Sequence, residues 1–210
     1  VIKRKLGAGG FGAVYLAEQV QTKAPVAIKI MLSRIAVAPE ARDKFQKEIQ
    51  IMKGLQHPNL VQLMDQGSVG GAFYFIMEYC EAGSVADLLY RRGGKLDLVE
   101  ARSLMLDALE GLAFVHEKGF VHRDLKPENL LLKGLRQIRV AKICDLGFAK
   151  NFEQAGFSGM TMTGAYAGTP LFMPREQLTN FKYVKPTSDV WSLAATFYVM
   201  LTGTLPREFP

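Results

Sequence analysis

The chain has 210 residues, 49% of them hydrophobic, which is enough to bury a sizeable core. Its formal net charge of +6 is modest, and its Lys and Arg residues stand among acidic neighbours, as in EARDKFQKE. Acidic ligands are therefore favoured only weakly, and no nucleic-acid partner is expected. The two cysteines, Cys80 and Cys144, lie far apart without CxxC or Cys/His ligand spacing, which argues against a disulfide framework and a zinc site and favours a cytoplasmic location.

The termini and the apolar runs give no sign of targeting. No signal peptide opens the chain, and its most apolar run, VWSLAATFYVML, is too short to span the ~30 Å hydrocarbon core of a bilayer, so we predict a buried helix there. Because the first residue is not Met and the last residues are GTLPREFP, we expect the chain to be a segment of a longer protein.

The first part of the chain has the pattern of a β-rich lobe. VIKRKLGAGGFGAVYLAEQV and APVAIKIM predict strands, two of them joined by glycines as a hairpin, and LVQLMDQG and AFYFIMEYC predict two more. Between these runs, Phe45, Ile49 and Met52 recur at helical spacing with Glu48 on the same face. A carboxylate on an apolar stripe needs a cationic partner.

Helical patterns dominate after residue 80. VADLLYRR predicts a short helix, and a longer one is expected to begin at residues 97–100, which resemble a capping box, and to end near Gly119. Its buried face is predicted to consist of Ala101, Leu104, Ala108, Leu112 and Val115. Strands followed by helices predict two lobes of one α+β unit, with a ligand expected between the lobes.

The segment GAGGFGAV places Gly7, Gly9 and Gly12 at the spacing G-x-G-x-x-G. This spacing lets backbone amides approach phosphate oxygens without obstruction by Cβ atoms. A glycine-rich hairpin turn without a ligand and a dinucleotide-binding turn are the alternatives. The dinucleotide interpretation requires a helix next, whereas AVYLAEQV has the pattern of a strand.

Lys29, in VAIK, stands at the end of a predicted strand, where its ammonium group could contact phosphate and pair with Glu48. One pairing would account for two charged residues that are otherwise misplaced. A solvated surface lysine is the alternative, which the flanking Ala27 and Ile28 make less favourable.

Two further motifs, HRDLKPEN at residues 122–129 and DLGFAK at 145–150, complete a larger set. With residues 7–14, VAIK and Glu48, they occur in the order and approximate spacing of the protein kinase signature set. Five motifs over nearly the whole chain make chance a remote explanation. The sequence resembles a eukaryotic-type Ser/Thr protein kinase domain.

This resemblance implies a single domain with a two-lobed, kinase-like α+β fold. The N-lobe, at about residues 1–79, would hold an antiparallel β-sheet plus one helix, and a hinge would follow at about 78–83. The C-lobe, at about 84–210, would be mainly helical and incomplete, because the family's later helices lie beyond the last residue. One face of its apolar central helix is therefore expected to be exposed.

The resemblance also implies transfer of the γ-phosphate of ATP to a Ser or Thr hydroxyl of a protein substrate. Asp124 would be the catalytic base, Lys126 would neutralise the transferred phosphoryl group, and Lys29 would pair with Glu48. Asn129 and Asp145 would bind Mg²⁺ through hard oxygen donors. A lysine at position 126 is typical of Ser/Thr kinases.

A further group of residues would contact ATP. They are Gly7, Gly9, Gly12, Val14, Ala27, Lys29, Met77, Glu78, Cys80, Leu131 and Cys144. Residues 78–80 would present backbone groups to the adenine edge, and the apolar residues would enclose the ring. Core packing is the alternative for the apolar residues, and an ordinary buried cysteine is the favoured interpretation of Cys144.

Residues 145–176 correspond to the activation segment of such kinases. Arg123, next to the base, is of the kind that binds a phosphate carried on this segment, so Thr161 and Thr163 are candidate regulatory sites, modified by autophosphorylation during self-association. Loop hydroxyls without a role are the alternative.

The segment GTPLFMPREQL corresponds to the substrate-binding loop. Thr169 matches the threonine that bridges the catalytic Asp and Lys, whereas Pro174-Arg175-Glu176 stands in place of Ala-Pro-Glu. The shifted proline is expected to disturb the local turn, and Glu176 is expected to lack its usual arginine partner. Asp189 matches the acid that caps the catalytic-loop backbone from a buried helix.

Two other function classes stay open. A catalytically silent pseudokinase acting as a scaffold is one, although its usual sign, the loss of a catalytic Lys or Asp, is missing. A small-molecule phosphotransferase of kinase-like fold is the other, and it is disfavoured because such enzymes seldom carry the Gly-Thr-Pro loop.

Overall fold

A computed structural model describes residues 1–9, 12–31, 50, 52–70, 72–134, 139–146, 170–179 and 184–206. These residues fall into two compact units. The N-terminal unit contains the described residues up to 79 except 57–60, and the C-terminal unit contains residues 57–60 together with the described residues from 80 onward.

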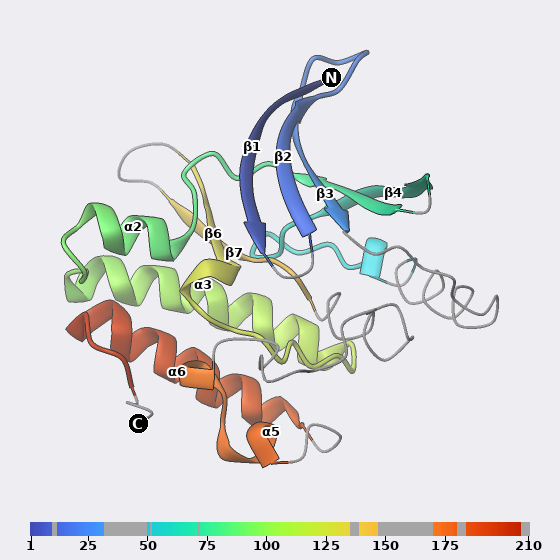
Figure 1. The fold of residues 1–210 in the computed structure, drawn as a ribbon. Coiled ribbons are helices and arrows are strands. Elements are labelled where there is room, and N and C mark those ends of the chain that lie inside the picture. Colours follow the sequence, from blue (N-terminus) through green and yellow to red (C-terminus); the bar gives the residue numbers. More distant parts are fainter. Residues whose placement is uncertain are drawn as a thin grey trace. The chain divides into compact units, whose positions relative to one another are not determined.

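The N-terminal unit is built on a five-stranded antiparallel sheet with the order β1-β2-β3-β5-β4 (Figure 1). Its strands are β1 (Ile2–Gly9), β2 (Gly12–Glu18), β3 (Pro25–Met31), β4 (Leu63–Val69) and β5 (Ala72–Glu78). All of the predicted strands of this lobe are confirmed. Of the helix predicted around Glu48, the structure describes only a few residues, including the buried Met52, and Glu48 itself lies outside the described part.

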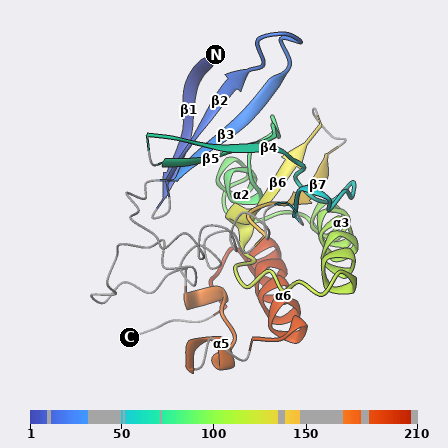
Figure 2. The same ribbon diagram turned by 90° about the vertical axis from the view of Figure 1, so that its right-hand side faces the viewer.

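The C-terminal unit is mainly helical, which confirms the α+β class. Its helices are α2 (Val85–Arg91), α3 (Leu98–Glu117), α5 (Arg175–Thr179) and α6 (Pro186–Thr202), with 3₁₀ turns at Pro127–Asn129 and Pro170–Phe172. A small antiparallel pair, β6 (Leu130–Lys133) and β7 (Val140–Ile143), completes the unit. The two long helices, α3 and α6, pack side by side in both ribbon views (Figure 2).

Helix α3 begins and ends where the sequence predicts. Asp97 is its N-cap, because one carboxylate oxygen accepts hydrogen bonds from the amides of Val99 and Glu100, both at 2.9 Å. At its other end Gly119 adopts a φ of 80°, and the amides of Gly119 and Phe120 donate to carbonyls in the last turn, as in a Schellman motif. The predicted face, Ala101, Leu104, Ala108, Leu112 and Val115, is fully buried.

Two details of helix capping differ from the expectation. The Glu100 carboxylate, which was expected to complete a capping box with Asp97, forms ion pairs with Arg139 at 2.9 Å and Arg92 at 3.4 Å. A complete capping box forms instead at α2, where Ser84 and Asp87 each accept a hydrogen bond from the other's backbone amide.

Polar side chains join α3 to the small sheet. Asn59 is buried, and its side-chain amide donates to the Ala141 carbonyl at 3.1 Å. Asp107 on α3 accepts a hydrogen bond from the Ala141 amide at 2.9 Å. Burial raises the pKa of the Asp107 carboxyl above its ordinary value, and this hydrogen bond opposes the rise in part.

Helix α6 is apolar and buried on one side only. Pro186 lies in its first turn, and Gly203, with a φ of 73°, ends it. Val190 and Tyr198 expose 51% and 47% of their surface, as expected for a central helix with one uncovered face. Among the described residues, no helix combines the length and hydropathy that crossing a bilayer would require.

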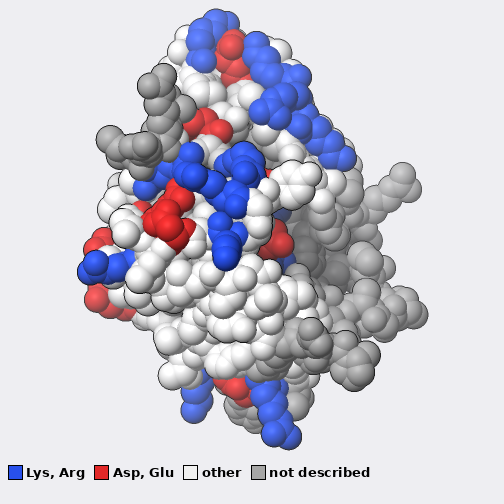
Figure 3. All heavy atoms as spheres, turned by 90° about the vertical axis from the view of Figure 1, so that its left-hand side faces the viewer, with Lys and Arg blue, Asp and Glu red and all other residues white. Residues whose placement is uncertain are grey.

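Charge on the surface is mixed in sign. On the face drawn in Figure 3, Asp and Glu side chains lie among the Lys and Arg side chains. In the N-terminal unit, for example, Glu18 has Lys3 at 3.2 Å and Lys23 at 3.8 Å. This distribution agrees with the weak preference for acidic ligands that the sequence indicates.

Candidate functional site

The predicted ATP-contacting residues of the N-terminal unit share one face of its sheet. Val14 lies directly opposite Lys29 in the β2–β3 ladder, and Ala27 lies opposite Met77 in the β3–β5 ladder. Side chains of directly opposed residues point to the same face, and Ala27 and Lys29 are two positions apart on one strand. All four therefore lie on one face. Ala27, Met77 and Lys29 are buried there, Lys29 with only 8% of its surface exposed.

The three glycines of the predicted phosphate loop differ in their surroundings. Gly12 has a φ of 150°, and a Cβ atom on it would lie 2.1 Å from the Ile30 carbonyl oxygen, so close packing of β2 on β3 requires a glycine. Gly7 has open space where its Cβ would be. Gly9 pairs with Gly12 at the end of the β1–β2 ladder, and the two residues between them lie outside the described part of the chain.

Glu78, the first of the residues predicted to face adenine, ends β5 in the N-terminal unit. The Glu78 amide donates to the Gln62 carbonyl at 2.9 Å, so this donor is already used within the unit. In the C-terminal unit, Cys80 is buried, and Leu131 and Cys144 are half-buried. The carbonyl of Gly83 and the amide of Ala82 bond to β6, beside Leu131.

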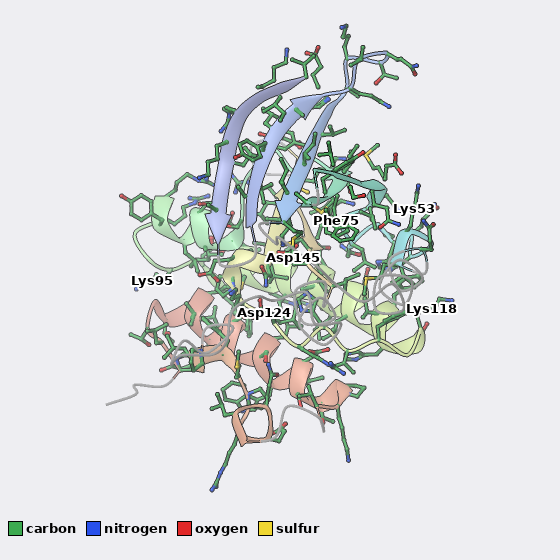
Figure 4. All side chains as sticks on the ribbon, turned by 45° about the vertical axis from the view of Figure 1, so that its right-hand side comes forward. Lys53, Phe75, Lys95, Lys118, Asp124 and Asp145 are labelled. Atoms are coloured by element: carbon green, nitrogen blue, oxygen red, sulfur yellow. The ribbon has the colours of Figure 1, made fainter. Side chains whose placement is uncertain are left out.

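Asp124, labelled in Figure 4, lies in the loop after α3. Its carboxylate has two neighbours. The Asn129 side-chain amide donates to the Asp124 carboxylate at 2.9 Å and to its backbone carbonyl at 2.6 Å. The Lys126 ammonium lies 3.5 Å from the same carboxylate oxygen. The three residues of HRDLKPEN predicted for catalysis and metal binding are thus brought together, with the Asp124 carboxylate partly exposed to solvent.

The loop that holds Asp124 is fixed by Asp189 on α6. Asp189 exposes only 1% of its surface, and its two oxygens accept the backbone amides of His122 and Arg123, both at 2.7 Å. The His116 ring on α3 lies 2.8 Å from one of these oxygens. This confirms the cap predicted for Asp189. It also explains how Arg123 is held at a φ of +69°, a conformation that is unfavourable for a residue with a side chain.

His122 connects the Asp124 loop to the strand that leads to Asp145. Its Nδ1 accepts the Asp124 amide at 3.2 Å, and its Nε2 donates to the Cys144 carbonyl at 2.8 Å. A backbone N–H can only donate and a carbonyl can only accept, so the ring carries its hydrogen on Nε2. The ring therefore bridges the peptide groups that carry the two predicted acidic site residues, Asp124 and Asp145.

The two predicted metal ligands, Asn129 and Asp145, lie at the same end of the β6–β7 ladder. The Cys144 amide donates to the Asn129 carbonyl at 3.0 Å, which extends the ladder by one pair and brings Asn129 next to the residue before Asp145. Both hydrogen bonds from Asn129 to Asp124 use the amide nitrogen, so the amide oxygen points elsewhere. An amide oxygen and a carboxylate are donors that suit Mg²⁺.

Among the residues that the structure describes, no group of three or more His, Cys, Asp or Glu could hold a metal by itself. Asn129 and Asp145 offer an amide oxygen and a carboxylate, the kind of donors that Mg²⁺ takes alongside phosphate and water oxygens, so these two residues fit the ion.

The segment with the shifted proline forms a regular turn, which corrects one expectation. The Pro174 carbonyl accepts the amides of Gln177 and Leu178, at 3.1 and 3.3 Å, and so begins α5. Glu176, for which no partner was expected once its usual arginine was missing, is not left unpaired. Ser188 at the start of α6 donates to the Glu176 carboxylate at 2.8 Å.

Several predicted residues cannot be placed. Glu48, Thr169, Thr161 and Thr163 lie outside the described residues. Conversely, the sequence does not reveal three polar side chains that hold the loop: the ring of His116, the bridging ring of His122 and the side-chain amide of Gln177, which donates to the Arg123 carbonyl. The one sequence feature that points to His116 is its position in the last turn of α3.

Comparisons with known proteins agree with this geometry. A family model described as "Protein kinase domain" matches residues 1–209. The chain is 34% identical over 209 residues to "Serine/threonine-protein kinase pkn2" of Myxococcus xanthus, an alignment that covers 100% of this chain and 25% of that protein. It is 33% identical over 204 residues to "Serine/threonine-protein kinase ATG1a" of Arabidopsis thaliana, covering 97% and 31%. It is 36% identical over 205 residues to "CBL-interacting protein kinase 21" of Oryza sativa subsp. japonica, covering 98% and 38%. The chain thus spans well under half the length of each of these relatives.

Proposed function

Since this chain belongs to the protein kinase family and its relatives are serine/threonine kinases, we propose that the protein transfers the γ-phosphate of ATP to a Ser or Thr hydroxyl of a protein substrate. The observation that carries the proposal is the arrangement around Asp124. Its carboxylate is partly exposed and has the Asn129 amide and the Lys126 ammonium as neighbours, on a loop anchored by the buried Asp189.

Asp124 acts as the general base. A substrate hydroxyl oxygen forms a bond to the γ-phosphorus as the bond to the bridging oxygen of ADP breaks, and the hydroxyl proton passes to the Asp124 carboxylate. Asn129 holds that carboxylate by its amide nitrogen, and Lys126 stands beside it to meet the charge of the transferred group. The roles of Thr169 and of a Lys29–Glu48 pair remain part of this proposal.

Asn129 and Asp145 would hold Mg²⁺, which, when bound with ATP, neutralises charge on the phosphates. The sheet face with Val14, Ala27, Lys29 and Met77 would take the nucleotide. On this face, the apolar side chains would pack against the adenine ring of ATP, and the buried Lys29 ammonium would pair with its phosphates. Leu131, Cys80 and Cys144 would contribute from the C-terminal unit.

Regulation is proposed to act through the activation segment. Phosphorylation of Thr161 or Thr163, by a second copy of the protein, would supply a dianionic group for Arg123 to bind, and hydrogen bonds to the Arg123 backbone hold this residue in place. Replacing both threonines with Ala should lower activity, and unchanged activity would remove this part of the proposal. We propose a cytoplasmic location on the basis of the cysteine usage alone.

The direct test offers labelled ATP, Mg²⁺ and generic protein substrates to the full protein and to an Asp124→Asn variant. We expect kcat to fall by about 10²–10⁴-fold, because the base is lost, with little change in melting temperature. Equal incorporation by both proteins would contradict the mechanism. A wild-type protein that binds ATP but transfers no phosphate would instead favour the pseudokinase scaffold.

A further inference from the structure

We propose that Gln177 is a positioning residue for the general base: its side-chain amide fixes the peptide group that carries Asp124. The inference rests on the proposed kinase function, and it concerns a residue in the segment where the chain departs from the family pattern. Gln177 follows Glu176 on α5, 54 positions from the residue it holds.

The contact is short and buried. Gln177 exposes only 3% of its surface, and its Nε2 donates to the Arg123 carbonyl at 2.6 Å. This carbonyl belongs to the peptide group that joins Arg123 to Asp124. The N–H of the same peptide group donates to His122 Nδ1 at 3.2 Å. The plane of this peptide is therefore fixed at both ends, and with it the direction in which the Asp124 side chain leaves the backbone.

The backbone at this point needs such support. Arg123 has a φ of +69°, which costs energy for a residue with a Cβ atom and persists only where surrounding contacts impose it. Asp189 holds the N–H side of Arg123, at 2.7 Å, and Gln177 holds its carbonyl side. Without Gln177, rotation of the following peptide would be opposed at its N–H end only, and the Asn129 contacts to Asp124 would shift with it.

The other end of the Gln177 amide shows that packing alone does not explain this residue. Its Oε1 is buried, and the described part of the chain offers it no hydrogen-bond donor. Turning the amide over would place this oxygen against the Arg123 carbonyl, so the observed orientation is the only favourable one. A buried acceptor without a donor lowers stability. An apolar side chain of the same length would avoid this cost but could not hold the carbonyl.

Gln177 also connects the base to the substrate-binding segment. The helix that carries it begins at the Pro174 carbonyl, and the neighbouring Glu176 bonds to Ser188 on α6. Asp189, the next residue of α6, holds the other side of Arg123. Hydrogen bonds thus connect α5, α6 and the loop that carries Asp124. Displacement of α5 is transmitted to Asp124 through one amide group.

Gln177→Met in the full protein tests this inference, because it removes the donor and the orphaned oxygen while keeping the side-chain length. We expect kcat to fall roughly tenfold or more, since small misplacements of catalytic groups are costly, with KM for ATP unchanged. The melting temperature should stay the same or rise. Hydrogen exchange at the Asp124 amide should become faster. The matched control is Asn59→Leu, which removes an equally buried amide-to-carbonyl bond in the same unit. It should lower the melting temperature and leave kcat within about twofold.

Gln177→Glu gives a readout that a structural role would not move. A protonated carboxyl can donate to the Arg123 carbonyl, whereas a carboxylate would repel it, and burial favours the protonated form. Activity relative to wild type should therefore recover as the pH is lowered, or equal wild type throughout if the carboxyl stays protonated.

Wild-type kcat in Gln177→Met would overturn the inference. So would a parallel loss of kcat and melting temperature in that variant without recovery in Gln177→Glu at low pH. If wild type and every variant lack kinase activity, the proposed function fails. Hydrogen exchange at Asp124 then still decides whether Gln177 holds this peptide.

Discussion

The two units hold their predicted site residues by different physical means. In the N-terminal unit, the register of backbone ladders places Val14, Ala27, Lys29 and Met77 on one sheet face. In the C-terminal unit, single polar side chains hold the loop around Asp124, and Asp189 alone accepts two of its backbone amides. In a ladder, many equivalent backbone hydrogen bonds together fix the register of the strands. We therefore expect the N-terminal unit to tolerate side-chain changes that keep the strand pattern, and the C-terminal unit to depend on individual atoms.

Asp189→Asn should have the largest effect on stability and activity together. The amide has one acceptor oxygen where the carboxylate has two, so at least one buried donor among the amides of His122 and Arg123 and the His116 ring loses its partner. We expect the free energy of unfolding to fall by about 2–3 kcal/mol and kcat to fall by about 10²-fold or more. Denaturant unfolding and steady-state kinetics measure the two effects.

Thr196→Val is the matched control on the same helix. Thr196 is buried, but its hydroxyl donates only to the Ser192 carbonyl one turn earlier, at 2.9 Å. This change should leave kcat close to the wild-type value. An Asp189→Asn protein as active and as stable as Thr196→Val would break the comparison, because the catalytic loop would then not depend on a single side chain.

Gly12→Ala should be the most damaging small change in the N-terminal unit. Its Cβ atom would lie 2.1 Å from the Ile30 carbonyl oxygen, at a φ of 150°. We expect a loss of roughly 1–3 kcal/mol in the free energy of unfolding, because the strand pair must separate locally. Gly7→Ala is the control. Among the described residues, apart from Gly7 and its two chain neighbours, no atom lies within 4 Å of its added Cβ, so stability should change by less than about 0.5 kcal/mol.

Equal losses of stability in the two glycine variants would contradict the packing argument. Both glycines belong to the predicted phosphate loop, so nucleotide affinity should be measured for both. Weaker ATP binding by Gly7→Ala at unchanged stability would show that the glycine at position 7 serves the ligand, whereas the glycine at position 12 serves the sheet.

The difference between the units also explains what the sequence could predict. Strands follow from a period of two, and the buried face of α3 follows from a period near 3.6, from Ala101 to Val115. Asp124, Asn129 and Asp145 follow from the resemblance of their motifs to the protein kinase signature set. The periods of strands and helices do not reveal them.

Contacts between distant segments have no such signal. Gln177 meets Arg123 across 54 positions, and His116 meets Asp189 across 73. A glutamine after a helix start, or a histidine in a last helical turn, is compatible with many environments. The Ser188 partner of Glu176 is equally hidden, because the family pattern leads one to expect an arginine there. Such contacts depend on how helices pack, which single residues do not reveal.

Asp107 offers a weaker test in the C-terminal unit. Burial raises its pKa above 3.8, so its proton is bound more tightly in the folded protein than in the unfolded one. The stability that it contributes is present below pH 3.8 and is lost as the pH rises through the folded pKa. In Asp107→Asn, the amide oxygen can still accept the Ala141 amide. The stability of the variant minus that of wild type should therefore grow as the pH rises above 3.8, as denaturant unfolding would measure. A difference that shrinks with pH would contradict the burial effect.

Lys53→Met should have the smallest effect, and it concerns a carboxyl group with the opposite shift. Asp65 in the N-terminal unit has its pKa lowered, first by the hydrogen bond from Lys53 at 3.1 Å and then by the Gln66 backbone. The stability from this pair is present above pH 3.8 and is lost as the pH falls through the lower folded pKa. The Asp65 and Lys53 side chains expose 62% and 38% of their surface, so the variant should lose less than about 0.5 kcal/mol near neutral pH, and the loss should vanish in high salt. An NMR titration of Asp65 should show its pKa moving up toward 3.8 in the variant. An unmoved pKa would assign the shift to the backbone hydrogen bond, and a loss as large as that of Gly12→Ala would show that this unit, too, depends on individual polar side chains.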